Sequence, residues 1–281
     1  EGYVKGSVQG RLRGARVVFD FSTVGGTEHL MMAAALAEGV TLLENCAKEP
    51  EIIDLANFLN LLGADIRGAG TSQIRIEGAE RLDGGAFEAV SDRIEVGTYL
   101  IAAAATGGRL EICNAVAEHN SALLEKLREA GAEISTNEGK ISLDMQGQRP
   151  RAVNIVTGPY PAFPTDLQAQ MMTLNCLAEG ACSIQETIFE NRFMHVPELA
   201  RMGAEIQLQN NNSVALVKGV GELIGAPVMA TDLRASASLV IAGIAASGET
   251  TVDRVYHIDR GYQQIEERLQ RLGVDIKREA G

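Results

Sequence analysis

Four turns in the sequence contain small polar residues, three of them together with acidic or basic ones, and lead into apolar stretches. They comprise residues 22–27, 91–95, 163–166 and 230–234. The N-terminus of a helix offers free backbone N–H groups and a positive dipole end, which together favour anions. Ser, Thr and Asp also cap helices without any further role. Each turn by itself therefore indicates either an anion site or a plain N-cap, and convergence of several turns would favour the former.

Two further segments each contain an arginine and a histidine three positions apart. They read Phe189-Glu190-Asn191-Arg192-Phe193-Met194-His195 and Tyr256-His257-Ile258-Asp259-Arg260-Gly261-Tyr262. A guanidinium presents a planar fork of donors that fits a carboxylate or phosphate, although a surface ion pair uses the same group. His195 and His257 suit either acid–base chemistry near neutral pH or a structural place beside an aromatic ring.

Composition and motifs disfavour several classes of function. The 281 residues are 46 % hydrophobic and 22 % charged, as expected of a globular chain with a full core. A net charge of −12 opposes binding to nucleic acid or to an anionic membrane surface. The sequence has no P-loop, no Gly-x-Gly-x-x-Gly loop and no apolar run of the ~20 residues that a membrane span needs. Neither nucleotide-triphosphate nor dinucleotide chemistry is favoured.

The cysteines and the first residues give information about the cellular compartment. Cys46, Cys113, Cys176 and Cys182 are scattered without a Cys-x-x-Cys pair or zinc-ligand spacing, so we expect reduced thiols and no metal. The first residues, Glu1-Gly2-Tyr3-Val4, show neither the basic nor the apolar stretch of a secretory signal. These features predict a cytoplasmic protein.

An internal repeat must position the candidate residues. Glycines at 63, 131, 203 and 273 each follow a leucine-rich helical stretch and precede a short alternating strand, at intervals of roughly 70 residues. Earlier in each unit, Gly39, Gly107, Gly180 and Gly248 end an alanine-rich helix and precede a β-like run. The unit reads strand, helix, strand, helix, hairpin. This predicts an α/β fold of pseudo-symmetric units with helices and strands on opposite sides.

The repeat also predicts the domain organisation. Residues 1–90 hold one unit and a leading strand and form part of a first domain, whereas residues 91–281 hold three repeats and form a second domain. Residues 3–8 resemble the closing strand of a unit whose earlier part is absent, and the last repeat has no closing strand after Ile276. We therefore expect the chain to be part of a larger protein with its N-terminal part missing.

Four motifs give the sequence a family resemblance. They are residues 161–170 (PAFPTDLQAQ), 189–195 (FENRFMH), 230–237 (ATDLRASA) and 256–262 (YHIDRGY). In this order they closely resemble the bacterial UDP-N-acetylglucosamine 1-carboxyvinyltransferases, roughly their C-terminal two-thirds. The resemblance covers essentially the whole chain. It implies an enolpyruvyl-transferase-like inverse α/β barrel fold, with six such units in two domains facing a cleft.

The resemblance also implies a reaction. These enzymes transfer the enolpyruvyl group of phosphoenolpyruvate to the 3-hydroxyl of UDP-N-acetylglucosamine, the first committed step of peptidoglycan precursor synthesis. The substrates are thus the two expected small-molecule partners, and neither a cofactor nor a metal is implied. The chemistry needs a base at the hydroxyl, an acid for the methylene carbon, and cations against the phosphate and carboxylate.

Site residues follow from the same resemblance. Asp166 is the candidate base, and Arg234 and Arg260 are candidates to hold phosphoenolpyruvate, with Arg260 counted among the catalytic residues. Arg192 is a further substrate-binding candidate. The nucleotide-sugar site is implied at Phe21, Ser22, Thr23, Val24, Gly25 and Ile188.

Departures from the family are as informative. Its mobile loop with a reactive cysteine, its Lys-Asn pair and a loop arginine have no counterpart here, so none of the four cysteines takes that catalytic role. Phe21 stands where a lysine is expected, which puts that substrate contact in question. We expect little turnover from the chain alone and a need for the missing segment in cis or in trans. The alternatives are 3-phosphoshikimate 1-carboxyvinyltransferase, which the FENRFMH stretch disfavours, and a ligand-binding fragment without catalysis.

Overall fold

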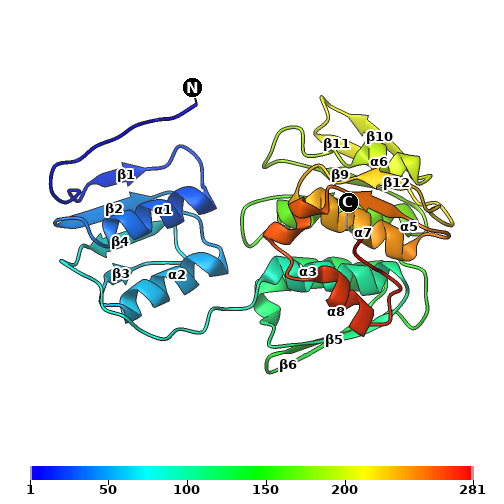
Figure 1. The fold of residues 1–281 in the computed structure, drawn as a ribbon, viewed down its shortest axis with the longest axis horizontal. Coiled ribbons are helices and arrows are strands. Elements are labelled where there is room, and N and C mark those ends of the chain that lie inside the picture. The colour runs from blue at the N-terminus through cyan, green and yellow to red at the C-terminus, as the bar shows by residue number, and fades with distance from the viewer. Residues whose placement is uncertain (1, 280–281) are drawn as a thin grey trace. The chain divides into compact units, whose positions relative to one another are not determined.

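The computed structural model describes residues 2–279, whose contacts separate into two compact units (Figure 1). The first unit ends at Val90 and also includes residues 159–161. The second unit begins at Ser91 and holds the rest of the described chain. No helix in residues 2–279 is long and apolar enough to cross a membrane.

The first unit is a sheet of four strands with two helices. Its elements are β1 (Arg16–Val18), α1 (Val24–Ala34), β2 (Val40–Glu44), α2 (Pro50–Leu61), β3 (Asp65–Arg67) and β4 (Gln73–Glu77). The strand order is β1-β2-β4-β3, with β1 parallel to β2 and the other neighbours antiparallel. Buried Leu43, Ile52 and Ile74 belong to the core between sheet and helices. Residues 3–8 form no strand, so the expected closing strand is not formed there.

The second unit contains three repeats. The first has α3 (Arg93–Ala105), β5 (Arg109–Cys113), η1 (Ala117–Asn120), α4 (Ser121–Ala130), β6 (Glu133–Asn137) and β7 (Lys140–Asp144). The second has β8 (Ile155–Val156), η2 (Thr165–Leu167), α5 (Gln168–Leu177), β9 (Ala181–Gln185), α6 (Val196–Arg201), β10 (Glu205–Gln209) and β11 (Val214–Lys218). The third has β12 (Pro227–Met229), α7 (Leu233–Ala245), β13 (Thr251–Asp253), η3 (Val255–Arg260) and α8 (Ile265–Arg271).

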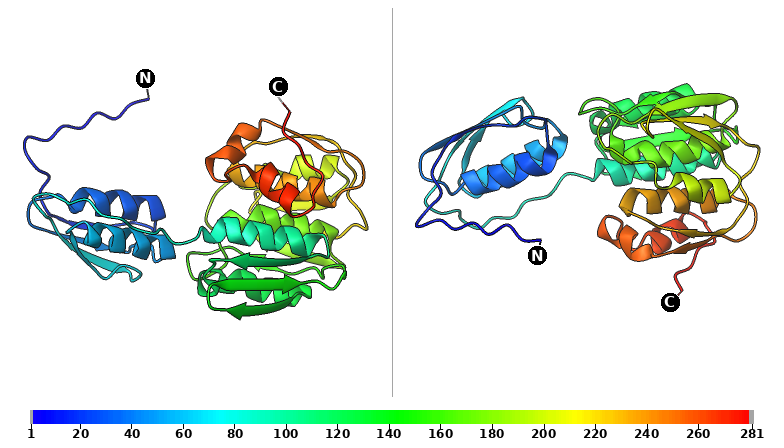
Figure 2. Two further views of the ribbon diagram at one scale, coloured as in Figure 1. Left: turned by 60° about the horizontal axis from the view of Figure 1, so that its bottom comes forward. Right: turned by 90° about the horizontal axis from the view of Figure 1, so that it is seen from above.

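Three helices form the centre of the second unit. Helices α3, α5 and α7 contact one another in every pairing, and the sheets lie outside them (Figure 2). Helix α5 is buried along its whole length, because it packs between the other two. The sequence left open whether helices or strands face inward; within this unit the helices do.

Glycine conformation explains the repeat boundaries. Gly39, Gly107, Gly180 and Gly248 all have φ between 66° and 98°, a left-handed region that L side chains rarely enter. Each ends an alanine-rich helix and turns the chain into the next strand, as the sequence predicts. The antiparallel hairpins also follow the predicted pattern, with β4, β7 and β11 as the central strands.

The sheets of the described residues are open. The second unit has sheets ordered β5-β7-β6, β8-β9-β11-β10 and β12-β13. The last repeat has only its parallel pair, and residues 274–279 form no strand. The α/β repeat fold is therefore as predicted, but it is built from open sheets around helices.

Candidate active site

Asp166 is the centre of a charged cluster in the second unit. It lies in η2, which leads into α5 without any side-chain cap. One carboxylate oxygen accepts from Nη2 of Arg192 at 2.8 Å, and the other accepts from Nη2 of Arg234 at 3.0 Å. Three residues from three different motifs thus meet in one place.

The arginines control the charge of Asp166. Burial acts to raise its pKa, but the positive charges and hydrogen bonds of Arg234 and Arg192 outweigh burial and lower it. Burial likewise acts to lower the pKa of Arg234, and Asp166 and Tyr262 reverse that effect, so it is raised. Asp166 is therefore a carboxylate and Arg234 a guanidinium throughout the physiological range.

The start of helix α7 fixes Arg234. Asp232 caps this helix by accepting from the backbone N–H groups of Arg234 at 2.8 Å and Ala235 at 2.9 Å. Nη1 of Arg234 and Oγ1 of Thr231 are both buried and find no partner among the described residues. The cluster thus retains an unused donor on a cation, which is what an anionic ligand requires.

Arg192 is held by the segment that follows β9. Its guanidinium carbon lies 4.8 Å from the ring centre of Phe189, a cation–π contact. Buried Glu186 organises this segment by accepting from the backbone N–H groups of Ile188 at 2.7 Å and Phe189 at 3.1 Å. Ile188, implied in nucleotide-sugar binding, is 38 % exposed.

Glu186 was not anticipated from the sequence. Its other hydrogen bonds come from the hydroxyls of Thr157 at 2.9 Å and Thr165 at 2.8 Å, so it joins the end of β8, the turn before Asp166 and the segment before Arg192. An acidic residue directly after the strand 181–185 was the available signal. The two threonines are 29 and 21 residues away, so these contacts could not be read from the local pattern.

Arg260 has no hydrogen bond or ion pair with Asp166, Arg192 or Arg234. It is exposed at the end of η3 and forms no hydrogen bond or ion pair with any residue in 2–279. Two positions on, Tyr262 is fully buried, with its hydroxyl 2.8 Å from that of Thr98 in α3. The role implied for Arg260 stays a prediction.

The implied nucleotide-sugar residues 21–25 belong to the first unit, at the start of α1. Thr23 is the N-cap and accepts from the N–H of Gly26 at 3.3 Å. Phe21, which replaces the expected lysine, is 74 % exposed. Their role in substrate binding stays a prediction as well.

The histidines differ in environment. His195 is 2 % exposed, and burial lowers its pKa to about 4, so it is neutral at pH 7. The ring of His257 packs on that of Tyr256, with centres 4.3 Å apart. The structural alternative fits His195, because a donor of protons at neutral pH needs a higher pKa.

The buried cysteines are poor nucleophiles. Cys46, Cys176 and Cys182 are buried and Cys113 is exposed, all as free thiols. Burial raises the pKa of Cys176 and of Cys182 to about 12, so neither is a thiolate.

Comparison with known proteins places these residues in a family. The profile described as EPSP synthase (3-phosphoshikimate 1-carboxyvinyltransferase) matches residues 1–269. The UDP-N-acetylglucosamine 1-carboxyvinyltransferase of Klebsiella pneumoniae (strain 342) is 59 % identical over 281 residues, which are 100 % of this chain and 67 % of that protein. The enzyme of the same name from Cronobacter sakazakii (strain ATCC BAA-894) is 60 % identical with the same coverage.

The chain belongs to the UDP-N-acetylglucosamine 1-carboxyvinyltransferase family. It spans about two-thirds of the length of these family members. The family of transferases thus found is the one that the four sequence motifs resemble, and it is favoured over the 3-phosphoshikimate alternative.

Solved structures show that the family fold is present. The enolpyruvyl transferase NikO from Streptomyces tendae superposes with a TM-score of 0.84 at 26 % identity, covering 95 % of this chain and 66 % of that one. EPSP synthase from Acinetobacter baumannii superposes with a TM-score of 0.72 at 18 % identity, covering 96 % and 64 %. The second likeness concerns the fold alone.

Proposed function

We propose that this chain carries out its part of enolpyruvyl transfer from phosphoenolpyruvate to the 3-hydroxyl of UDP-N-acetylglucosamine, in peptidoglycan precursor synthesis. The observation that carries the proposal is the carboxylate of Asp166 held between Arg192 and Arg234. Relatives with 59 % and 60 % identity bear the name of this activity.

The charges suggest how the cluster works. Two guanidinium groups stabilise the Asp166 carboxylate, and this makes it a weak base. A bound anion that draws Arg234 toward itself, through the unused Nη1, would remove part of that stabilisation. The pKa of Asp166 would then rise, and the carboxylate could accept the proton of the sugar 3-hydroxyl. Binding of phosphoenolpyruvate and activation of the base are coupled in this proposal.

Arg260 completes the anion site in the proposal. Its guanidinium has no partner among the described residues and is free to contact a phosphate or carboxylate. Residues 21–25 and Ile188 contact the nucleotide-sugar. No group among the candidates serves as the acid for the methylene carbon.

We further propose that turnover needs polypeptide outside these 281 residues, supplied in cis or in trans. The loop cysteine, Lys-Asn pair and loop arginine that the family resemblance implies have no counterpart in this sequence. Losing one preorganised charge contact typically costs about 10²- to 10³-fold in rate. A cytoplasmic location is proposed because four free cysteines suit a reducing compartment.

Phosphate release that depends on UDP-N-acetylglucosamine tests the proposal. The purified chain should release little phosphate, and adding the upstream third of a family member as a second polypeptide should restore release. Robust release by the chain alone, with full-length enzyme excluded by mass spectrometry, would overturn the need for that segment. No release from a stable, stoichiometric complex would favour a ligand-binding fragment without catalysis.

A further inference from the structure

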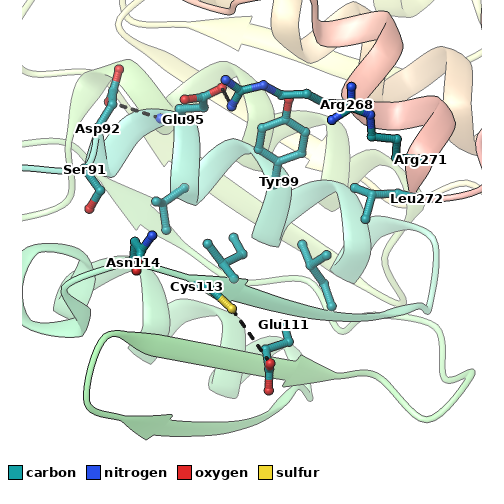
Figure 3. Close-up of a pocket in the computed structure, with 13 residues that line it drawn as sticks. Ser91, Asp92, Glu95, Tyr99, Glu111, Cys113, Asn114, Arg268, Arg271 and Leu272 are labelled. Atoms are coloured by element: carbon teal, nitrogen blue, oxygen red, sulfur yellow. Dashed lines mark hydrogen bonds and ion pairs between the residues drawn. The ribbon is translucent and has the colours of Figure 1, made fainter.

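The residue that follows the strand after each repeat's first helix differs between repeats. Asn45 follows β2 and Asn114 follows β5, and both are left-handed, with φ of 59° and 57°. Asn114 and Cys113, at the end of β5, line a pocket of about 490 Å³ (Figure 3). After β9 the chain continues instead with Glu186, which is not left-handed. The repeat that carries Asp166 thus has a different residue and a different conformation at this place.

A backbone hydrogen bond identifies the residues that correspond to Glu186. In three repeats, an N–H just beyond this strand donates to the carbonyl of the residue before the central hairpin strand. The pairs are Cys46 to Ser72 at 3.1 Å, Ala115 to Gly139 at 3.1 Å and Glu186 to Ser213 at 2.9 Å. All three donors are buried, but Cys46 and Ala115 have small apolar side chains. The hairpin therefore forms without a carboxylate at this position.

The carboxylate of Glu186 is thus an addition that the repeat itself does not require. Burial of a charged group opposes folding unless hydrogen-bond donors satisfy it. Within residues 2–279, the donors to Glu186 are neutral hydroxyls and backbone N–H groups. A departure from a local rule that the fold does not need is typical of a functional position.

One oxygen of this carboxylate holds the turn of the candidate base. Oε2 of Glu186 accepts from the hydroxyl of Thr165 at 2.8 Å. Thr165 immediately precedes Asp166 in η2. The contact therefore restrains the turn from which the Asp166 side chain extends.

The other oxygen holds the segment that carries Arg192. Oε1 accepts from the backbone N–H groups of Ile188 at 2.7 Å and Phe189 at 3.1 Å, and from the hydroxyl of Thr157 at 2.9 Å. The guanidinium carbon of Arg192 lies 4.8 Å from the centre of the Phe189 ring, and Arg192 binds the candidate base at 2.8 Å. Two routes, one through each oxygen, thus lead from this buried carboxylate to the candidate base.

We propose that Glu186 is a positioning residue that fixes the candidate base and residues 188–192 relative to each other. It acts on Asp166 through Thr165, and on Ile188 and Arg192 through the backbone of their segment. The inference rests on the proposed function and deepens it, because Ile188 belongs to the implied nucleotide-sugar site. A base must stand at a fixed distance from the bound hydroxyl, since a misplacement of about 1 Å can cost ~10²-fold in rate.

Steady-state kinetics of the complemented enzyme separate the two contacts. Thr165→Val removes only the first contact and should lower kcat for phosphate release at least ~10-fold, with little change in KM for UDP-N-acetylglucosamine. Glu186→Ala removes both contacts and should lower kcat and also raise this KM. Ala115 shows that the fold accepts alanine at the corresponding place. Thr136→Val and Glu205→Ala, at exposed positions of the same unit, are matched controls and should leave both constants unchanged.

A double variant tests whether Glu186 acts through Thr165. Combined with Glu186→Ala, Thr165→Val should lower kcat no further, because both changes remove the same contact. Glu186→Gln should restore the KM lost in Glu186→Ala, since an amide oxygen still accepts from the N–H groups of Ile188 and Phe189. A merely structural role would lower the yield of folded enzyme without this coupling. Effects on kcat that multiply in the double variant would overturn the inference.

A proton NMR signal tests the positioning without turnover. The ring current of Phe189 shifts the Nε–H signal of Arg192, and Phe189→Leu gives the reference position without the ring. The signal is assigned by its absence in Arg192→Lys. In the purified chain, Glu186→Ala should move it toward the reference, and Thr165→Val should leave it near its position in the parent.

The outcomes separate this inference from the reaction assignment. If the complemented parent releases no phosphate, the reaction assignment fails, and an Arg192 signal that still moves in Glu186→Ala supports the positioning. If the parent is active and Glu186→Ala, folded by circular dichroism, keeps kcat and KM within about twofold, the inference is overturned. An Arg192 signal that does not move in Glu186→Ala would overturn it as well.

Discussion

Asp166 and Asp232 lie at equivalent turns of successive repeats, yet their carboxylates bind different partners. Asp232 accepts two backbone N–H groups and caps α7. Asp166 accepts from no backbone N–H at the start of α5, and both of its oxygens bind arginine. The repeat therefore fixes where a carboxylate lies, and the partners from other repeats decide what it can do.

The remaining turns agree with this contrast. Asp92 caps α3 by accepting from Ile94 at 2.8 Å and Glu95 at 3.1 Å, and Thr23 caps α1. Three of the four polar turns singled out from the sequence thus carry a side chain that caps the following helix. Only the turn at Asp166 departs from capping, and this departure marks it as the candidate site.

The largest effect should come from removing the Asp166 carboxylate. In the complemented enzyme, Asp166→Ala should lower the rate of phosphate release by ~10²-fold or more, the usual contribution of a positioned base. Asp65→Ala, which removes an exposed carboxylate of the first unit, is the matched control and should keep the rate. A rate within twofold of the parent for Asp166→Ala would refute the assigned role.

A second effect concerns stability and arises at His195. The charges of Asp232, from one of the two turns, and of Arg192, a partner of Asp166, both act on the pKa of this histidine. Burial lowers its folded-state pKa to about 4, below the ordinary value of 6.5. Its contribution to stability is therefore complete above pH 6.5 and is lost as the pH falls toward 4, by at most about 1.4 kcal/mol per pH unit.

Urea unfolding followed by circular dichroism measures this loss of stability at each pH. Tryptophan fluorescence cannot be used instead, because the chain has no tryptophan. His195→Asn should be less stable at pH 7 but should show a smaller decline between pH 6.5 and 4 than the parent. An identical decline in both proteins would mean that other groups cause it.

Substitution by asparagine should distinguish the two aspartates through a smaller effect, on the free energy of unfolding. Asp232→Asn should change the free energy of unfolding little, since an amide oxygen also caps a helix, whereas Asp232→Ala should cost about 1 kcal/mol. Asp166→Asn should cost more than Asp232→Asn, because it leaves two guanidinium groups without a counter-charge. The reverse order would contradict the contrast between cap and ion pair.

The smallest effect is expected at Phe21. Because this ring is 74 % exposed, Phe21→Lys should change the free energy of unfolding by less than about 0.5 kcal/mol. Binding of UDP-N-acetylglucosamine to the complemented enzyme is the useful measurement. Tighter binding by the lysine variant would support the implied contact, and unchanged affinity would remove residue 21 from the substrate site.

Local pattern predicted much of this fold. The glycines at 39, 107, 180 and 248 take the expected left-handed conformation, and the alternating runs around Ile74, Ile141 and Ala215 form the expected hairpin strands. These features depend on backbone preference and on a period of two, both of which a single sequence reveals.

The contacts within the candidate site could be predicted less well from local pattern. The motifs named Asp166, Arg192 and Arg234, but not which arginines would contact the carboxylate, since that depends on how α5, α7 and the segment after β9 pack together. Glu186 was missed for the same reason. Its four hydrogen bonds come from three segments that only the fold brings together.

Titration of the Asp166 carboxyl tests the central claim most directly. Carbon-13 NMR of the chain, with the signal assigned by its absence in Asp166→Asn, should give a midpoint below the ordinary value of about 3.9, and Arg234→Met should raise that midpoint. A midpoint at or above the ordinary value, unchanged in Arg234→Met, would show that the arginines do not hold this carboxylate and would contradict the account.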